Sequence, residues 1–232
     1  MRNWCYRSTQ MLSYVLLWPF TRLHIWRAPG ALGSPATAVV VANHISHFDP
    51  FLLSYAFPRP IDWMTTEEFY SNPLMRTWLR ALNTVPVDRS RPDHRALRVG
   101  VERLRAGRIV GVFPEGGIRA GATSILGGAA PKSGAAALAR IAGVPIIPSV
   151  IFGADRLYAP RSWLPGPPRA KVWIAIGPPL SVSDASGRQA SARLVEALRE
   201  IGAAAITHFA LSPDDLPATP QRRKGRDAQP TA

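Results

Sequence analysis

Cysteine is nearly absent from this chain of 232 residues, and the single Cys5 excludes an internal disulfide or a cysteine metal site within one chain. Lysine is also scarce, because 25 of the 28 basic residues are arginine. Acidic residues are few, with 15 Asp and Glu, so the formal net charge is +13. This excess predicts attraction to anionic membranes, phosphorylated substrates or nucleic acid, although genomic compositional bias explains the arginine equally well.

Long apolar runs are missing as well. No stretch reaches the roughly 18 to 20 residues that a membrane-spanning helix needs, and residues 11–20 lack the small-residue cleavage pattern of a secretory signal. Residues 1–28 instead mix aromatic rings with arginines, namely Trp4, Tyr6, Tyr14, Trp18, Phe20 and Trp26 with Arg2, Arg7, Arg22 and Arg27. This mixture is typical of a membrane–water interface, and we expect amphipathic helices there, broken near Pro19. A helical segment packed on its own domain is the alternative.

The rest of the chain has no internal repeat and alternates short apolar runs with amphipathic segments. We expect strands at 37–42, 61–65, 84–87, 109–113, 144–151 and 170–176, and helices at 51–57, 67–81 with a break at Pro73, 93–106, 134–142 and 190–210. This order predicts an α/β fold with a single mixed, mostly parallel sheet flanked by helices, after an N-terminal helical membrane-interface segment. The expected divisions are residues 1–30 for that segment, 31–212 for the sheet domain and 213–232 for a disordered basic tail.

A histidine and an aspartate follow the first apolar run of the sheet domain. His44 comes two residues after the end of this run, and Asp49 lies five residues further on. A carboxylate beside an imidazole fixes its tautomer and stabilises the imidazolium, so the pair can act as an oriented general base. Since no G-x-S-x-G motif provides a nucleophile, we expect His44 to activate a hydroxyl of the substrate.

A second polar cluster, residues 113–119, follows the apolar run at 109–112 in the same way. Its glycines, Gly116 and Gly117, allow close approach of the backbone to a ligand, and Arg119 offers a guanidinium group. Together with Arg89 and Lys132 it could bind a phosphate. A surface turn with solvated arginines is the alternative reading of this cluster taken alone.

Four blocks in order resemble the glycerolipid acyltransferase family, typified by the 1-acylglycerol-3-phosphate acyltransferases. They are N-H-x4-D at 43–49, a short strand ending in arginine at 85–89, F-P-E-G at 113–116 and V-P-I-x-P at 144–148, with a lysine–glycine element at 132–134. One departure concerns the third block. The family usually has threonine then arginine after it, whereas here Gly117 and Ile118 displace Arg119 by one position.

The resemblance implies an O-acyltransferase that moves a fatty acyl group from acyl-CoA or acyl carrier protein to a lysophospholipid hydroxyl, such as that of 1-acylglycerol-3-phosphate. It implies His44 as general base, oriented by Asp49, without a metal, another cofactor or a covalent enzyme intermediate. The implied substrate-binding residues are Asn43, Arg89, Glu115, Gly116, Arg119 and Lys132. We then expect a peripheral or interfacially anchored protein on the cytoplasmic face of a bacterial cell membrane. Its partners would be the anionic membrane surface, the acceptor and the acyl donor, and not nucleic acid.

Three alternatives stay open at this point. A member of the same family could act on a non-glycerophosphate acceptor, such as an ornithine-type lipid or another lipid alcohol, because Arg119 is displaced. A metal hydrolase could use His44, His47 and Asp49 as ligands. A non-enzymatic basic module could bind nucleic acid or anionic lipid, although the arginines are scattered rather than gathered in a reading motif.

Overall fold

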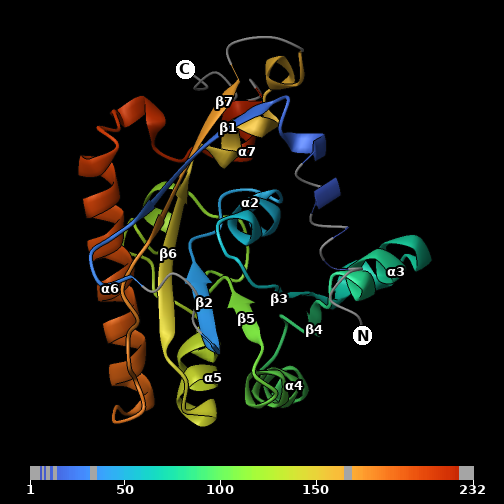
Figure 1. Ribbon diagram of the computed structural model, residues 1–232, viewed down its shortest axis with the longest axis vertical. Helices are drawn as coiled ribbons and strands as arrows, with labels where there is room; N and C mark the ends of the chain where they lie inside the picture. The colour runs from blue at the N-terminus through green and yellow to red at the C-terminus, as the bar shows by residue number, and fades with distance from the viewer. Residues whose placement is uncertain are drawn as a thin grey trace, which may run out of the picture.

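The computed structural model describes residues 6, 8, 11, 12, 15–31, 36–164 and 169–224. Its centre is a seven-stranded sheet with the strand order β1-β7-β6-β2-β5-β3-β4 (Figure 1). Neighbouring strands run parallel except β6 and β7, which are antiparallel. The predicted single mixed, mostly parallel sheet flanked by helices is therefore confirmed.

The strands are β1 Thr21–Arg27, β2 Ala38–Ala42, β3 Ile61–Thr66, β4 Val85–Val87, β5 Ile109–Val112, β6 Ile146–Phe152 and β7 Ala170–Ile176. The described chain forms the helices α2 Asp49–Tyr55, α3 Pro73–Ala81, α4 His94–Arg105, α5 Gly134–Ala142, α6 Gly187–His208 and α7 Pro220–Arg223. It also forms the 3₁₀ turns η1 Glu67–Tyr70, η2 Gly121–Thr123, η3 Ala154–Tyr158, η4 Pro160–Trp163 and η5 Pro213–Asp215. From β2 to α6, the elements agree with those expected from the sequence to within a few residues.

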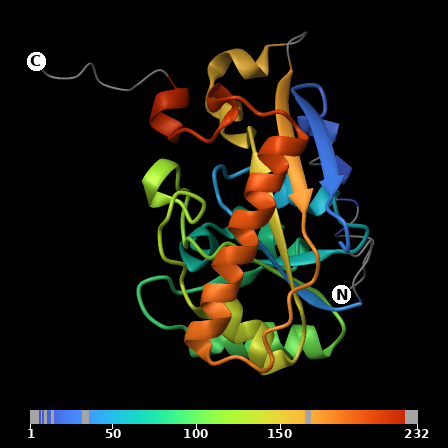
Figure 2. The ribbon, with the colours of Figure 1, turned by 90° about the vertical axis from the view of Figure 1, so that its left-hand side faces the viewer.

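Both faces of the sheet are buried, which explains why its central strands are continuous apolar runs. Along β2, Val39 and Val41 face one core, while Ala38, Val40 and Ala42 face the other. The first core lies under α4, α5 and α6, and Figure 2 shows α6 lying lengthwise across this side of the molecule. The second core lies under α2 and includes Leu17 of the N-terminal segment.

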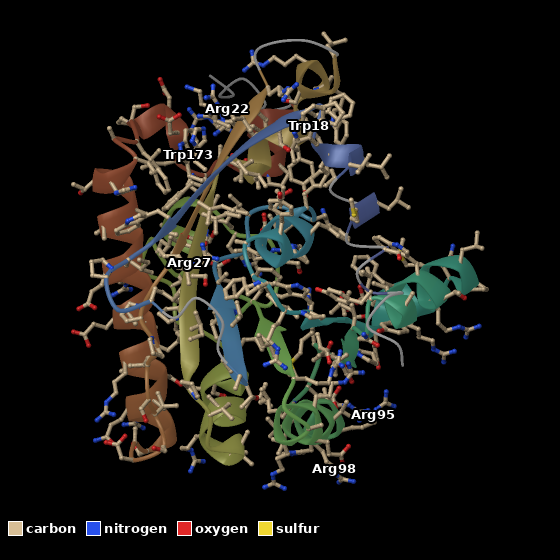
Figure 3. The ribbon with its side chains drawn as sticks, in the orientation of Figure 1. Trp18, Arg22, Arg27, Arg95, Arg98 and Trp173 are labelled. Carbon is tan, nitrogen blue, oxygen red and sulfur yellow. The ribbon has the colours of Figure 1, made fainter. Side chains whose placement is uncertain are left out.

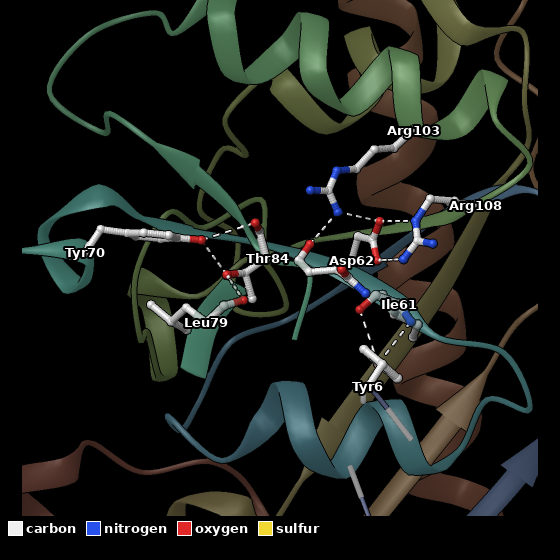
Figure 4. A network of polar contacts seen from close by, with 9 residues as sticks. Tyr6, Ile61, Asp62, Tyr70, Leu79, Thr84, Arg103 and Arg108 are labelled. Carbon is white, nitrogen blue, oxygen red and sulfur yellow. Dashed lines mark hydrogen bonds and ion pairs between the residues drawn. The ribbon is translucent and has the colours of Figure 1, made fainter. Parts of the chain in front are cut away.

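A buried carboxylate ties α4 to the outer part of the sheet (Figure 4). Asp62 of β3 is fully buried and accepts a hydrogen bond of 2.6 Å from Arg103 of α4. Arg108, just before β5, contacts both oxygens of the same carboxylate. The cluster therefore joins α4 and the start of β5 to β3, the strand next to the edge strand β4. Removing one partner would leave an uncompensated buried charge.

The N-terminal segment differs from the prediction of helices throughout residues 1–28. Its described residues 6, 8, 11, 12 and 15–17 are helical, but Thr21–Arg27 forms β1, so the helix predicted there is wrong. Leu23 and Ile25 alternate into the second core, and the whole strand pairs in parallel with β7. Residues 1–5, 7, 9, 10, 13 and 14 lie outside the described residues, and a membrane-interface role for this segment stays a prediction.

The C-terminal segment is also more ordered than expected. The fully buried carboxylate of Asp155 accepts hydrogen bonds from Arg223 Nε at 2.6 Å and from the Ala218 amide at 2.9 Å. Arg156 pairs with Asp215 at 2.6 Å. The prediction of disorder is therefore wrong for residues 213–224, and residues 225–232 lie outside the described residues.

Candidate active site

Two loops meet at the carboxyl ends of adjacent parallel strands, where open α/β sheets place their sites. The chain leaves β2 into residues 43–49 and leaves β5 into residues 113–119, and Val41 lies opposite Val112 in the sheet. The amide of His44 donates to Glu115 Oε2 at 2.8 Å, and the amide of Arg119 donates to the His44 carbonyl at 2.8 Å. The two polar clusters predicted from the sequence are thus brought together.

His44 and Asp49 form a hydrogen-bonded pair at the start of α2. The Nδ1 atom of His44 lies 2.9 Å from Asp49 Oδ2, which also accepts from the amides of Ile45 at 2.7 Å and Ser46 at 2.8 Å. Burial raises the pKa of the fully buried Asp49, while the contacts with His44, Ser46 and Ile45 act in the opposite direction. This arrangement fixes the ring and leaves Nε2 as the nitrogen that a substrate can reach.

Two aromatic rings hold the face of His44. Its imidazole stacks on Phe113 with ring centroids 4.1 Å apart, and Phe113 stacks on Trp63 at 4.6 Å. The absence of a side chain at Gly111 makes this possible, because a Cβ there would come within 2.3 Å of the Trp63 ring. The imidazole of His44 is therefore the outer member of a stack of three rings.

An apolar cavity of about 740 Å³ opens beside this stack. His44 lines it and is 7% exposed, so its ring is in contact with the cavity rather than sealed in the core. Most of the remaining lining is apolar, from α2, α3 and the stacked rings, with Phe48, Phe51, Met75, Trp78, Leu79 and Leu82 among it. Such a cavity suits a hydrocarbon chain, and a base at its wall can reach a group that the chain carries.

A second, more polar cavity of about 590 Å³ lies between the β4–α4 loop and the start of α5. Arg89 lines both cavities, and Arg91 and Lys132 line the polar one together with Asp88 and Asp93. Two cationic groups, those of Arg89 and Lys132, thus lie close to the end of the cavity that contains His44. This is a suitable place for an anion attached to an apolar substrate.

Residues 31–152, more than half of the chain, match the family described as Acyltransferase. This chain belongs to the acyltransferase family. It is 26% identical to a 1-acyl-sn-glycerol-3-phosphate acyltransferase of Bacillus subtilis over 166 residues, which are 70% of this chain and 77% of the relative. It is 25% identical to the enzyme of the same name from Streptococcus pneumoniae over 182 residues, 77% of this chain and 64% of that protein.

A solved structure has the same fold. The 1-acyl-sn-glycerophosphate (LPA) acyltransferase PlsC from Thermotoga maritima superposes with a TM-score of 0.62, covering 86% of this chain and 79% of its own, at 23% identity. The chain is therefore an acyltransferase by family and shares the sheet architecture of this solved member. The resemblance noted from the four sequence blocks is confirmed.

Three of the predicted substrate-binding residues of this acyltransferase either make hydrogen bonds within the protein or lie outside the two cavities. Asn43 is buried, and its side-chain amide exchanges two hydrogen bonds of 2.9 Å with the backbone of Ile151. Glu115 gives one oxygen to the His44 amide and the other to the Ile125 amide, each at 2.8 Å. Arg119 is exposed and lines neither cavity. The buried and hydrogen-bonded amide of Asn43 does not fit the expected substrate-binding role. The contacts of Glu115 fix the loops, and its role in binding substrate stays a prediction.

Gly116 and Lys132 are adjacent, as the sequence blocks suggested. Gly116 has φ of +67°, and a Cβ there would come within 2.6 Å of the Lys132 side chain. The Lys132 ammonium donates to the carbonyl of Arg89 at 3.4 Å, and its amide donates to Pro114 at 2.8 Å. The glycine thus allows the lysine to lie across the loop and reach the polar cavity.

His47 does not join His44 and Asp49 in a ligand set. Its Nδ1 lies 2.5 Å from the hydroxyl of Tyr158, whose oxygen also accepts from the His47 amide at 3.0 Å. Within the part of the chain that the structure describes, no group of three His, Cys, Asp or Glu converges as metal ligands. Tyr158 is a neighbour of the site that sequence reasoning missed, since it is 111 residues away and has no motif of its own.

Proposed function

We propose that this acyltransferase moves a fatty acyl group from a thioester, acyl-CoA or acyl carrier protein, to the hydroxyl of a lysophospholipid such as 1-acylglycerol-3-phosphate. The observation that carries the proposal is the hydrogen-bonded pair of His44 and Asp49 at the wall of an apolar cavity, with Arg89 on the boundary to a polar cavity. The names of the curated relatives supply the acceptor class.

In the proposed reaction, Nε2 of His44 takes the proton of the acceptor hydroxyl as its oxygen attacks the thioester carbonyl carbon. Asp49, bonded to Nδ1, stabilises the imidazolium that forms. A positioned general base of this kind contributes about 10²- to 10⁴-fold to the rate. The tetrahedral intermediate then expels the thiolate, which takes the proton from the imidazolium, and the ester and the free thiol are released.

The phosphate of the acceptor would lie in the polar cavity. Arg89 can bind it with two N–H groups and Lys132 adds a point charge, while the acyl chains occupy the apolar cavity on the other side of Arg89. Arg119 lies outside both cavities, so a lipid alcohol without a phosphate, such as an ornithine-type lipid, is the alternative acceptor.

Lipid substrates require contact with a membrane. None of the described helices is long and apolar enough to cross one. Large apolar side chains are exposed on the N-terminal segment and on α3, namely Met11, Leu12, Val15, Leu16, Trp18, Leu74, Met75 and Trp78. Of these, Met75 and Trp78 also line the apolar cavity. Exposed apolar and aromatic groups of this kind favour binding at the interface, and we propose a peripheral enzyme on the cytoplasmic face of the membrane.

Thioester consumption with free-thiol detection, measured across a panel of lysolipids and lipid alcohols, tests the proposal. We expect His44→Ala to lower kcat by about 10²- to 10⁴-fold with the fold retained by circular dichroism. His47→Ala is the matched control, because it removes a neighbouring imidazole that bonds to Tyr158 and not to Asp49. Transfer by His44→Ala at the parental rate would show that the base is assigned wrongly, and a preference for a phosphate-free acceptor would select the alternative.

A further inference from the structure

A large basic cavity lies apart from His44, at the end of the molecule where β7 begins. Its volume is about 1050 Å³, and its walls come from η3, η4, the first residues of β7 and residues 213–223. Six cationic side chains line it, namely Arg156, Arg161, Arg169, Lys171, Arg222 and Arg223. Two carboxylates, those of Asp214 and Asp215, also line it, so the cavity carries a net positive charge.

Two of these arginines build the wall. Arg223 is bonded to the buried Asp155 and Arg156 to Asp215, each at 2.6 Å. These pairs hold the C-terminal segment against η3. The cavity is therefore formed by fixed ion pairs and is not a gap beside a loose tail.

Three other cationic side chains of the cavity can contact a ligand. Arg161, Lys171 and Arg222 are exposed, and none of them makes an ion pair with the described part of the chain. Lys171 lies opposite Arg22 in the register of β7 and β1, and residues directly opposite one another in a sheet point to the same face. Arg22 thus adds a further positive charge beside the cavity.

The rim of this basic cavity is apolar and aromatic. Trp18, Trp163 and Leu164 are 51%, 40% and 67% exposed. The guanidinium of Arg169 lies 4.7 Å from the centre of the Trp18 ring, so the charge and the aromatic surface are directly adjacent. A binding site for a soluble anion does not need such groups, whereas aromatic rings beside arginines are typical of the membrane–water interface.

The same rim continues to the apolar cavity of the active site. The ring of Trp163 lies 5.6 Å from that of Phe48, and Phe48 lines the cavity that contains His44. Figure 3 shows Trp18 and Arg22 at the end of the molecule near the C-terminal segment, and Arg98 at the opposite end. A bilayer that contacts the rim would therefore meet the basic cavity and Phe48 on one surface.

We propose that the basic cavity binds the phosphate headgroups of anionic phospholipids and so seats this end of the enzyme on an anionic bilayer. The inference rests on the proposed function in one respect, that the acceptor comes from a membrane. It assigns the headgroup contact to Arg161, Lys171 and Arg222, outside the catalytic and acceptor-binding residues. Each basic side chain near an anionic surface strengthens binding severalfold at moderate ionic strength.

A charge-removal variant of the full chain, Arg161→Ala with Lys171→Ala and Arg222→Ala, tests the proposal. The matched control removes three exposed arginines from α4 and α5, by Arg98→Ala, Arg105→Ala and Arg140→Ala. Sedimentation with vesicles of phosphatidylcholine, with or without added phosphatidylglycerol, measures partitioning. We expect the cavity variant to lose on the order of 10- to 100-fold in partitioning onto phosphatidylglycerol vesicles, and the control to lose much less. Binding to pure phosphatidylcholine should be the same for both.

Other outcomes overturn the proposal. Equal losses in the two variants would mean that net charge acts without a site. Unchanged vesicle binding, with inorganic phosphate protecting the parent but not the cavity variant from thermal unfolding, would mean that the cavity takes a soluble anion.

Acyl transfer to a water-soluble short-chain acceptor without vesicles should be the same in parent and cavity variant. If the parent fails that assay while the vesicle results hold, the proposed function fails and the headgroup site stands.

Discussion

The carboxylate of Glu115 accepts a hydrogen bond of 2.8 Å from the backbone amide of His44. Its other oxygen accepts from the amide of Ile125 at the same distance, so one side chain joins three segments of the chain. Burial raises the pKa of Glu115, and the two amides act in the opposite direction. Glu115 therefore fixes the backbone from which His44, the proposed base, projects.

Glu115→Gln should weaken both the fold and the reaction. A glutamine has one acceptor oxygen, so one of the two amides would face an N–H group, at a cost of about 1–3 kcal/mol in the free energy of unfolding. A displaced base should lower kcat on the order of 10- to 100-fold, with KM for the acceptor unchanged. Denaturant unfolding and steady-state kinetics measure both. Glu102→Gln, on the exposed face of α4, is the control, and a raised KM at unchanged kcat would instead show that Glu115 contacts substrate.

Gly111→Ala should disturb the stack of rings behind His44. The new Cβ would come within 2.3 Å of the Trp63 ring, and overpacking in a core costs about 1–3 kcal/mol. Because Trp63 stacks on Phe113 and Phe113 on His44, the activity should fall together with the stability. Adding Trp63→Leu removes the overlap with the ring and should recover part of the stability, while the approach of the new Cβ to Ile61 at 2.7 Å remains.

The control for this experiment is Gly187→Ala at the start of α6, where an added Cβ meets nothing within 4 Å. Thermal unfolding and acyl transfer are measured on all four proteins. A Gly111→Ala enzyme with parental stability and rate would mean that the ring layer adjusts freely and does not support the base.

Arg89→Ala should select against phosphate-bearing acceptors. Losing a charge-assisted hydrogen bond costs about 1.5–3 kcal/mol, so kcat/KM for a lysophosphatidic acid acceptor should fall roughly 10- to 100-fold. For a neutral lipid alcohol it should hardly change. Arg89→Lys should be intermediate, because it keeps the charge and loses the planar fork. Arg119→Ala should leave both acceptors unaffected, since Arg119 lies outside the two cavities, and the reverse pattern would exchange the roles of the two arginines.

Asp93→Asn should make the stability less sensitive to acid. Burial acts to raise the pKa of Asp93, but backbone hydrogen bonds with Ala96, Asp88 and Arg95 outweigh it and leave the pKa lowered. A carboxylate with a lowered pKa stabilises the fold above its unfolded pKa, and this contribution is lost as the pH falls through the folded pKa. Asparagine still caps a helix but does not titrate.

The measurement is the free energy of unfolding of parent and Asp93→Asn against pH. The stability advantage of the parent should be greatest above about pH 5 and should disappear in stronger acid. A pH-independent difference would mean that the charge of Asp93 plays no part. Because Asp93 also accepts from the amide of Asp88, the variant further tests whether this cap positions the loop that carries Arg89.

The strands of the sheet were predicted correctly where each one forms a separate apolar run in the sequence. The run at 38–42 is apolar because both of its faces are buried, and the two loops at the strand ends could be paired because parallel strands share one edge. Asn43 and Glu115 were placed in the site for their motifs, but their hydrogen bonds run to Ile151 and Ile125, which no local pattern indicates.

The errors at the two ends have similar causes. Leu23 and Ile25 alternate as in a strand, and this signal was available, but the aromatic residues around it favoured an interfacial helix. The C-terminal segment has the polar composition of a disordered tail, and its order depends on Arg223 meeting a buried Asp155 that lies 68 residues earlier. Contacts of this range are set by the tertiary fold and not by local propensity.

The pairing of β1 with β7 has a consequence for how the protein is made. Thr21 lies opposite Ala170, so β1 cannot pair with β7 until almost 150 further residues have been synthesised. Contacts between such distant segments form slowly. The β2–β5–β3 sheet around His44 is complete well before then. During translation, residues Thr21–Arg27 are therefore expected to remain unpaired until β7 has been synthesised. In that interval they can bind to the bilayer or to a chaperone.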